Sequence, residues 1–561
     1  MAQKFAQLDL PDGHSVRRAV PGWTKPTSAD KKTAVSFVSW QYALFLPAVV
    51  LLYWRLPWRG RIFLLLAGSY FFYGMWDARF LALLLTTTVV DFFGALAIAG
   101  RRESAAKVIG IGLLPLGWLL GCVACHPAGG GVAKWILLAA ALFPMVYGTL
   151  YQRLWRLPEE KQRRAFLVLS IGSNLSVLGF FKYFNFFAGA LATLLETLGW
   201  NPGWTLRQII LPVGISFYTF QSISYAVDVY RGIARPSHDF FTFAAFVSFF
   251  PQLIAGPIER ANDLLPQLQK PAVFDPANLH RGLRLILIGL FKKVFVADNC
   301  ALLANYAFDA KTALNGQWAL LGVLAFAFQI YGDFSGYTDI ARGSARLLGI
   351  HLNWNFNFPY FAASPSDFWR RWHMTLSAWF RDYVYIPLGG NRDGTLKTFR
   401  NLWITMLLAG LWHGASWTFV MWGGYYAALL TLYRLVPGLH GPAESSALAR
   451  GRFALGAALM FAFTLVGWAI FRSKDLAQLT GWFAAFGNWN AVATVDWVKP
   501  FAWLLLHTVP LLGLQAATWK ARDEVEFTRF AWPVRGLAYT LIFLLVASSA
   551  VTDVEFIYFQ F

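Results

Sequence analysis

One histidine inside a long apolar stretch is the strongest candidate for chemistry in this sequence. His413 lies about 11 residues into the run 402–433, which is roughly 16 Å along a helix and near the middle of a bilayer core of about 30 Å. A low dielectric disfavours imidazolium, so the pKa is expected below its usual value of about 6.5 and the neutral ring can accept a proton. Gly410 and Gly414 would let a substrate chain or another backbone approach. The pattern indicates a general base; the alternative is a histidine that hydrogen-bonds a neighbouring helix.

Other titratable residues precede His413. His373 stands in RRWHMTLSAWFRD, and taken alone it is typical of a residue at the membrane interface. Asp333 and Asp339, in YGDFSGYTDIARG, fall in or near the apolar run 317–340. Buried carboxylates need partners, which arginines of the region 342–400 can supply. For these two aspartates we favour a structural network over proton transfer.

Basic residues are concentrated in the same region. They are Arg342, Arg346, Arg370, Arg371, Arg381, Arg392, Lys397 and Arg400. Such a cluster beside a cavity would attract a phosphorylated cofactor. The alternative is the ordinary enrichment of basic residues on the cytoplasmic side of a membrane protein, which accounts for about half of them.

Cysteine and metal chemistry find little support. The three cysteines, Cys122, Cys125 and Cys300, are too few for a disulfide framework. Cys122 to His126 fits the C-x-x-C-H haem-attachment pattern, but inert thiols or a disulfide between the nearby pair are favoured. No H-E-x-x-H, G-x-S-x-G or G-x-x-x-x-G-K-[ST] sequence occurs. We therefore expect no metal site.

The elements that position these residues are membrane helices. Apolar residues make up 57% of the 561 residues and charged residues only 14%, which makes a soluble protein very unlikely. Apolar runs occur near 34–54, 61–76, 79–100, 108–125, 132–151, 165–199, 207–230, 240–256, 281–300, 317–340, 402–433, 453–471, 500–518 and 533–550. We expect an all-α polytopic membrane protein with about 11–14 membrane helices, some short or re-entrant.

The net charge of +19 would suggest a nucleic-acid partner in a soluble protein, but here the membrane explains it better. The connections 55–61, 101–107 and 153–164 hold 11 basic residues and fall on one side if the spans alternate. The intervening connections hold only Arg79 and Lys134. We therefore expect the side that holds these 11 basic residues to be cytoplasmic. The polar arm 1–33, which has six basic residues of its own, then lies outside.

The segment 351–401 breaks the hydropathy pattern. It mixes tryptophan, phenylalanine and tyrosine with arginine, aspartate and asparagine. Such a segment lies at the interface or is packed inside the protein, because irregular backbone at membrane depth survives only where protein or water satisfies it. We expect a cavity here.

Five stretches carry a family resemblance. They are PVGISFYTFQSISYAVDVYRG (212–232), FFPQLIAGPIER (249–260), FQIYGDFSGYTDIARGSARLLGI (328–350), NFPYFAASPSDFWRRWHMTLSAWFRDYVYIPLGGNR (357–392) and LWHGASWTFVMWG (411–423). In these the chain resembles the membrane-bound O-acyltransferase (MBOAT) family, specifically the bacterial alginate O-acetyltransferase-like branch, which also includes the D-alanyl transfer protein of teichoic acid synthesis. The arm 1–33 has no counterpart.

The resemblance implies a fold and a site. The fold would be a helical bundle with re-entrant and interfacial helices around a central funnel that opens to the cytoplasm. His413 would be the essential histidine and His373 the second typical one. The funnel for donor and acceptor would involve Asp333, Arg370, Arg371, Trp372, Arg381, Asp382, Trp412, Ser416 and Tyr426. The donor would be acyl-CoA, with no tightly bound cofactor.

Two further features belong to the resemblance. Alginate-type members commonly read W-G-x-x-H-G after the essential histidine, whereas this chain has Tyr426 where that later histidine would stand, so Tyr426 would have to substitute for it. The ending FIYFQF resembles a family feature in which the tyrosine, here Tyr558, is a transient acyl carrier. An aromatic anchor at the membrane interface is an equally weighted alternative.

The resulting prediction is an enzyme that moves an acyl group, expected to be acetyl, from a cytoplasmic thioester across the bacterial inner membrane. The product would be an O-acetylated extracellular polysaccharide such as alginate or cellulose. Membrane lipid and an extracytoplasmic acetyltransferase would be partners, and nucleic acid would not. Alternatives are a D-alanyl or lipid O-acyltransferase, or a transporter or flippase without chemistry. The expected parts are the arm 1–33, N-terminal helices 34–210, a catalytic core 211–435 and C-terminal helices 436–561.

Overall fold

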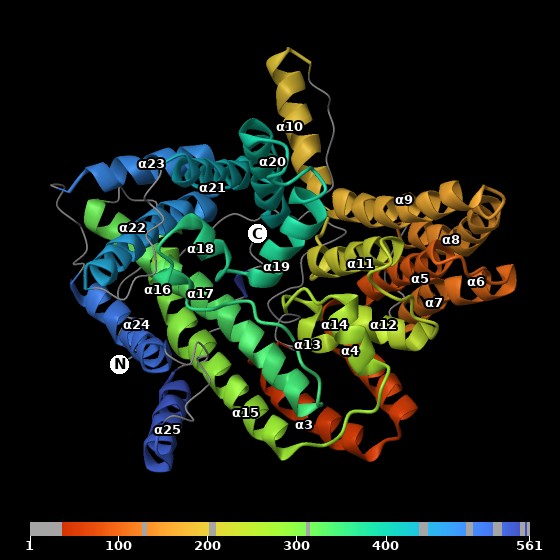
Figure 1. Cartoon of the computed structure of the whole chain (residues 1–561), viewed down its shortest axis with the longest axis horizontal. Helices are drawn as coiled ribbons and strands as arrows, with labels where there is room; N and C mark the ends of the chain where they lie inside the picture. The colour runs from red at the N-terminus through yellow and green to blue at the C-terminus, as the bar shows by residue number, and fades with distance from the viewer. Residues whose placement is uncertain are drawn as a thin grey trace.

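The computed structural model describes residues 36–125, 132–200, 209–309, 315–436, 447–489, 498–519, 530–549 and 556–557. Within these ranges the chain is helical and contains no strand, which confirms the all-α prediction. The N-terminal helices lie on one side of the molecule and the C-terminal helices on the other, with the central part of the chain between them (Figure 1). The predicted arm 1–33 lies outside the described residues.

The N-terminal half is made of helices joined by short connections. They are α3 (Trp40–Arg55), α4 (Trp58–Asp77), α5 (Leu81–Ile98), α6 (Ala105–Gly112), α7 (Leu114–Cys125), α8 (Val132–Leu154), α9 (Glu159–Leu178) and α10 (Phe184–Thr197). The π-helical turn η2 (Gly179–Tyr183) joins α9 to α10. Every position of α5 after its first turn except Thr86 is buried, so α5 lies at the centre of this half.

The central part alternates long and short helices. They are α11 (Ile215–Tyr230), α12 (Phe240–Ser248), α13 (Phe250–Leu253), α14 (Ala261–Leu268), α15 (Pro276–Leu290), η3 (Phe291–Ala297), α16 (Asp298–Asp309), α17 (Gly316–Leu347), α18 (Pro365–Trp369), α19 (Met374–Phe380), α20 (Thr395–His413) and α21 (Trp417–Leu435). The C-terminal helices are α22 (Ala447–Arg472), α23 (Leu476–Gly487), α24 (Val498–Thr518) and α25 (Trp532–Ser548).

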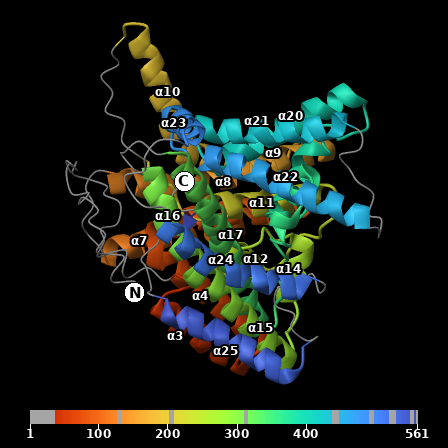
Figure 2. The same ribbon diagram turned by 90° about the vertical axis from the view of Figure 1, so that its left-hand side faces the viewer.

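Six stretches among the described residues are long and apolar enough to cross a membrane. They are Trp58–Ile98, Ala105–Val123, Glu159–Thr197, Gly316–Leu347, Gly451–Arg472 and Val498–Thr518. The stretch that ends in α10 has 39 residues, so at 1.5 Å per residue it is about 58 Å long and exceeds a bilayer core of about 30 Å. Accordingly, α10 projects from the bundle (Figure 2). The chain is a multi-pass membrane protein.

Glycines allow α17 to pack closely against α15. A Cβ on Gly336 would lie 2.7 Å from the carbonyl oxygen of Gly289, and a Cβ on Gly343 would lie 2.7 Å from that of Gly282. In each of these two pairs, a glycine of α17 faces a glycine of α15. The two backbones are therefore in direct contact at points where larger side chains would hold the helices apart. Small residues have this role in membrane helices generally, because packing rather than hydrophobicity brings helices together in lipid. The contact fixes α17, which carries both candidate aspartates.

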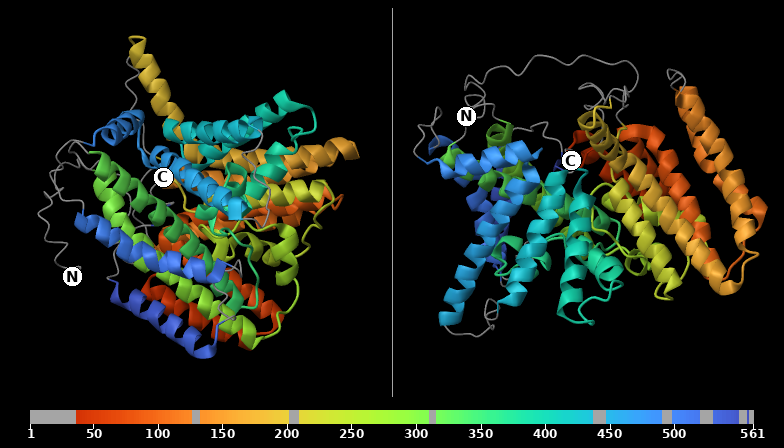
Figure 3. Two further views of the ribbon diagram at one scale, coloured as in Figure 1. Left: turned by 60° about the vertical axis from the view of Figure 1, so that its left-hand side comes forward. Right: turned by 90° about the horizontal axis from the view of Figure 1, so that it is seen from above.

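The three basic connections lie at one end of the bundle, as the alternation of spans predicted. Phe63, just after the first connection, contacts Phe241 with ring centroids 5.0 Å apart. Arg101, in the second, bonds His238 in the same loop region at 3.2 Å. Arg102 reaches Gln152, beside the third, at 2.7 Å. We call this the basic end; α10, which follows α9 away from the third connection, lies at the opposite end (Figure 3).

Part of the segment 351–401 is packed inside the protein. Asn355, Phe368, Trp372 and Trp379 are buried, and the main chain of Asn355 and Met374 pairs at 2.9 Å. Trp379 Nε1 also donates to the Phe220 carbonyl of α11 at 2.9 Å. The aromatic residues thus fill the centre, and neighbouring protein satisfies the irregular backbone. Of the two sequence interpretations, the interior one is correct for this part.

The packing of α15 on α17 yields a stability prediction. Gly336→Ala should lower the free energy of unfolding by about 1–3 kcal/mol, because the added Cβ meets a backbone oxygen that cannot move aside. Gly172→Ala in α9 is the matched control, since its Cβ would meet open space. That control should be neutral or stabilising by up to about 1 kcal/mol. Thermal unfolding in detergent measures both, and equal effects would contradict the close contact.

Candidate active site

His413 is the last residue of α20, not a residue inside one continuous helix. Gly414 continues in extended conformation, with φ −168° and ψ 158°. Ser416 then caps α21, its hydroxyl accepting the Thr418 N–H at 3.3 Å. The apolar run 402–433 therefore comprises two helices that meet just after His413, and the part from Leu402 to His413 is helical as the depth estimate assumed. The reason is local: Ser416 is a strong N-cap residue and Gly414 disfavours helix, so the chain turns immediately after the histidine.

Aromatic rings surround His413. The ring centroids of Trp412, Trp422 and Phe471 lie 5.0, 4.9 and 5.2 Å from that of the imidazole. The side chain is 6% exposed. Gly410 touches the Phe419 backbone, and Gly423 touches that of Met406, so α20 and α21 form a close hairpin. The space beside Gly410 is thus taken by another backbone, one of the two possibilities raised by the sequence.

His373 is fully buried, so the sequence expectation of an interfacial residue is wrong. It precedes α19 in a left-handed conformation with φ +42°, unusual for any residue except glycine. Neither ring nitrogen has a hydrogen-bond partner among the described residues. Such strain, about 1–3 kcal/mol, persists where the surroundings impose it and is concentrated at functional sites. A buried ring with two open nitrogens is available to a substrate.

Trp412 joins the two histidines. Its ring centroid lies 6.0 Å from that of His373 and 5.0 Å from that of His413. Phe217 of α11 packs on both Trp412 and His373, at 5.5 and 6.3 Å. Residues 40 positions apart in the sequence thus share one aromatic wall. Two imidazoles near one cavity can hold or accept protons at neighbouring points of a substrate.

Lys182 is a site residue that sequence reasoning missed. It lies in the π-helical turn η2, where its ammonium group donates to the Trp412 carbonyl oxygen and, at 3.3 Å, to Ser216 Oγ. Its nitrogen also lies 5.4 Å from the Trp412 ring centroid. A lone lysine in FFKYFNFF was the available signal, because an ionisable residue at membrane depth marks function by default.

Asp333 and Asp339 belong to a buried ion-pair network, as the sequence suggested. Lys293 bridges Asp298 and Asp333 at 2.8 Å each. Lys292 pairs with Asp339 at 2.7 Å, and Arg342 pairs with the same carboxylate at 3.2 Å. Only Arg342 comes from the arginine-rich region that was expected to supply the cations. The two lysines come from η3, where the π-helical turn directs both toward α17.

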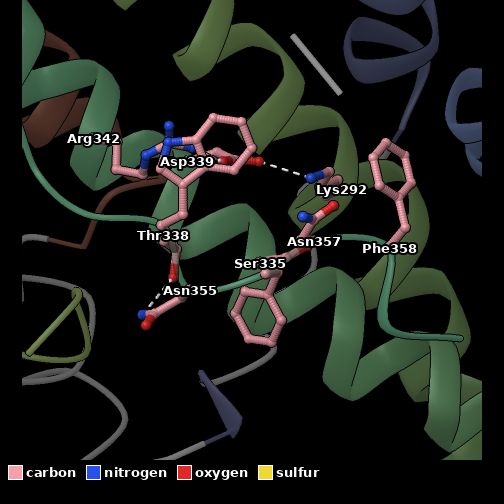
Figure 4. Close-up of a pocket in the computed structure, with 10 residues that line it drawn as sticks. Lys292, Ser335, Thr338, Asp339, Arg342, Asn355, Asn357 and Phe358 are labelled. Carbon is pink, nitrogen blue, oxygen red and sulfur yellow. Dashed lines mark hydrogen bonds and ion pairs between the residues drawn. The ribbon is translucent and has the colours of Figure 1, made fainter. Parts of the chain in front are cut away.

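A small polar cavity lies beside this network (Figure 4). Its volume is about 20 Å³, enough for one water molecule. Lys292 and Arg342 flank Asp339 on one side, and Asn355 lies away from them (Figure 4). Phe356 also lines the cavity. Arg342 Nε and Ser335 Oγ are buried without a hydrogen-bond partner among the described residues. The cavity has unused donors and a cationic rim, in the segment where the sequence predicted a cavity.

One ring separates this cavity from His373. Phe334 lies 5.0 Å from Phe356, which lines the cavity, and 4.7 Å from His373. The same ring lies 6.3 Å from Phe556, near the C-terminus. Ile557 is buried, and its backbone N–H donates to Asp333 Oδ2 at 2.7 Å. Phe556 and Ile557 are therefore docked one ring away from His373. Tyr558, the next residue, lies outside the described residues.

The structure brings some of the predicted funnel residues to the histidines and leaves others elsewhere. Trp372 is buried against Phe356 beside His373, with centroids 5.0 Å apart. Tyr426 is buried 5.1 Å from Trp422, one ring removed from His413. Ser416 caps α21, as described above.

The charged funnel residues lie in other surroundings. Arg370 and Arg381 are exposed. Asp382 binds Arg381 at 2.7 Å and Arg260 at 3.1 Å. Arg371 binds Asp367 at 2.9 Å. Ion pairs thus satisfy Arg371, Arg381 and Asp382. The cations that line the small cavity are Lys292 and Arg342 instead.

Comparisons with known proteins identify the family of this chain. The profile of the MBOAT, membrane-bound O-acyltransferase family matches residues 233–468. The chain is 36% identical over 481 residues to the "Probable alginate O-acetylase AlgI" of Pseudomonas putida, covering 85% of this chain and 83% of that protein. The chain belongs to the membrane-bound O-acyltransferase family.

Two further relatives bear on the chemistry. The "Peptidoglycan O-acetyltransferase" of Helicobacter pylori is 34% identical over 76% of this chain and 73% of its own length. The "Teichoic acid D-alanyltransferase" of Bacillus subtilis is 28% identical over 48% of this chain and 70% of its own length. As a family member the chain is an O-acyltransferase, which excludes the transporter without chemistry. The matched region holds both histidines and the ion pairs, whereas Lys182 and the docked C-terminal residues lie beyond it.

The burial of His373 predicts a pH dependence of stability. Burial lowers the pKa of its imidazole to about 3. The unfolded chain exposes the ring, whose pKa then returns to about 6.5. Below that pH the unfolded state binds a proton that the folded state does not, so stability is lost as pH falls from about 7 toward 3.

His373→Asn removes this titration, and asparagine tolerates the left-handed backbone. We expect the melting temperature in detergent to fall less steeply between about pH 7 and pH 5 in the variant than in the wild type. His280→Asn, at an exposed histidine of α15, should keep the wild-type slope. Parallel curves for the wild type and His373→Asn would contradict the prediction.

Proposed function

We propose that this O-acyltransferase transfers an acetyl group from a cytoplasmic thioester, acetyl-CoA, toward an acceptor outside the inner membrane. The final product is an extracellular polysaccharide, such as alginate or cellulose, that carries O-acetyl groups. Acetyl is favoured because the alginate O-acetylase of Pseudomonas putida and the peptidoglycan O-acetyltransferase of Helicobacter pylori align over 85% and 76% of the chain. The D-alanyltransferase relative aligns over 48%.

The observation that carries the mechanism is the pairing of two buried histidines through Trp412. In the proposed reaction His413 takes the proton of an attacking hydroxyl, whose oxygen bonds to the thioester carbonyl carbon. The carbon–sulfur bond then breaks, and the proton passes from His413 to the leaving thiolate. His373, with both ring nitrogens open, orients the donor or stabilises the oxyanion.

The cationic cavity supports a place for the polar part of the donor. Lys292 and Arg342 line it, and Phe334 alone separates its Phe356 wall from His373. Arg342 Nε has no partner among the described residues and can donate to an incoming oxygen. In this proposal one oxygen of the donor takes the place of the single water that the cavity can hold. The aromatic wall excludes further water from the thioester.

The docked C-terminus supports an acyl relay. Ile557 is held by Asp333, and Phe556 packs 6.3 Å from Phe334, which contacts His373. We propose that the Tyr558 hydroxyl attacks the thioester and carries the acetyl group as an ester. An extracytoplasmic acetyltransferase then removes it for the polymer. This partner meets the chain at the end opposite the basic end, which is cytoplasmic in this orientation.

His413→Ala tests the base. We expect ester-linked acetate on the secreted polymer to fall about 100-fold or more, because a positioned general base contributes at least this much to such a reaction. His238→Ala, at an exposed histidine of the basic end, is the matched control and should keep wild-type acetate. Unchanged acetate in His413→Ala at normal protein level would exclude the assignment. Mass spectrometry of the released ester groups identifies D-alanine directly, which would replace the acetyl proposal with the D-alanyl one.

Tyr558→Phe tests the relay. Transfer to the polymer should be lost while the melting temperature stays at the wild-type value, because only a hydroxyl is removed. Wild-type protein incubated with isotopically labelled acetyl-CoA should yield a C-terminal peptide that is acetylated at Tyr558, detected by mass spectrometry. Tyr433→Phe, at a buried tyrosine of α21, serves as the control. Wild-type polymer acetylation in Tyr558→Phe would show that the acyl group reaches the acceptor without this tyrosine.

A further inference from the structure

A second cavity lies between α15 and α25, and neither histidine of the candidate active site lines it. Its volume is about 390 Å³, within the range of small-molecule sites. The lining residues are His280, Arg284, Trp532, Arg535, Gly536 and Tyr539. Two come from α15 at a spacing of four residues, and the others lie along one face of α25, so two helix faces form an open groove.

The groove is cationic. Arg284 and Arg535 contribute two permanent positive charges, and His280 adds a third titratable group. Neither guanidinium forms an ion pair with a carboxylate in the part of the chain that the structure describes. No acidic residue is among the described residues that line the groove. Two arginines facing one groove without counter-charge favour an anion with several oxygen acceptors.

The groove lies at the basic end of the bundle. Arg346 donates to Asn278, in the first turn of α15, at 3.1 Å. The carbonyl oxygen of the neighbouring Leu347 accepts a hydrogen bond from Trp54 Nε1 at 2.9 Å. Trp54 directly precedes the first basic connection, 55–61. The groove is therefore level with the ends of the helices, where lipid headgroups meet the protein. Trp532 and Tyr539 are the residue types that are enriched at this depth.

Apolar surface adjoins the charged groove. Leu283 of α15 is 52% exposed, and Leu537 and Leu541 of α25 are 72% and 56% exposed. Leu283 and Leu537 lie between groove residues on their helices, and Leu541 lies two residues beyond Tyr539. A soluble anion would use the arginines alone, whereas a phospholipid would use both the arginines and the leucines. The combination distinguishes a lipid from free phosphate.

We propose that the groove between α15 and α25 binds the phosphodiester headgroup of an anionic phospholipid. Arg284 and Arg535 bind the phosphate oxygens, Trp532 and Tyr539 lie at the level of the headgroup and glycerol, and the acyl chains lie along the exposed leucines. A zwitterionic lipid binds more weakly, because its cationic group meets two arginines. The site concerns how the enzyme is held and stabilised in its membrane and does not depend on the proposed acyl acceptor.

Native mass spectrometry of the full-length protein tests this site, with dioleoyl phosphatidylglycerol and dioleoyl phosphatidylcholine titrated separately. We expect the wild type to bind phosphatidylglycerol more tightly, and the double variant Arg284→Gln/Arg535→Gln to lose about tenfold in affinity for it. Arg55→Gln/Arg59→Gln is the matched control, because it removes two exposed charges at the same end outside the groove. This control should keep wild-type affinity.

The competing outcomes are distinct. Equal binding of the two lipids by the wild type, or equal losses in both double variants, would overturn the site. Displacement of the lipid by inorganic phosphate at equal concentration would show that the groove takes the phosphate alone and would overturn the lipid assignment. If the double variant does not fold, Arg535→Gln must lower phosphatidylglycerol affinity while Arg535→Lys restores most of it.

Discussion

The buried bridge of Lys293 to Asp298 and Asp333 positions most of what surrounds the two histidines. It joins η3 and α16 to α17 with two contacts of 2.8 Å. Removing one partner of a buried ion pair typically costs about 3–5 kcal/mol, because the remaining charge is left without water or counter-charge. The bridge also leaves Asp333 Oδ2 as an acceptor for Ile557. A single carboxylate thus ties α17 both to η3 and to the end of the chain.

The next residue along α17 transmits this arrangement to the site. Phe334 is fully buried and contacts His373, Phe356 and Phe556. Its position is fixed by the neighbouring ion pair on one side and by the glycine contact of Gly336 with Gly289 on the other. A shift of α17 would move the cavity wall, the His373 ring and the docked C-terminus together. The rigidity of α17 therefore serves the site directly.

The two histidines have different environments. His413 ends a helix inside a close hairpin, where aromatic rings line its imidazole. His373 is held in a left-handed backbone conformation and keeps two open nitrogens in a fully buried position. Lys182 approaches the same wall through Trp412 from the N-terminal half. Helices from both sides of the molecule are thus needed to complete one site, although the family profile matches only its central part.

Composition and hydropathy determined the all-α membrane class, because apolar runs of about 20 residues are long enough to cross the bilayer as helices that satisfy their own backbone hydrogen bonds. Local patterns also identified His413, Asp333 and Asp339, since ionisable residues in apolar surroundings stand out without any knowledge of contacts. His373 was singled out only by the family resemblance. The common end of the three basic connections followed from simple alternation of spans.

Which residues pair with the buried carboxylates was decided only by the tertiary structure. Nothing in the sequence selects Lys292 and Lys293 as partners, with Arg342, over the other seven nearby basic residues, because the π-helical turn that directs the lysines to α17 has no clear sequence signature. Nor could it place Arg381 and Asp382 in a surface network, or dock Ile557 on Asp333 across 224 positions. Such contacts depend on how helices distant in the sequence pack, and in a water-free interior that packing determines which charges meet.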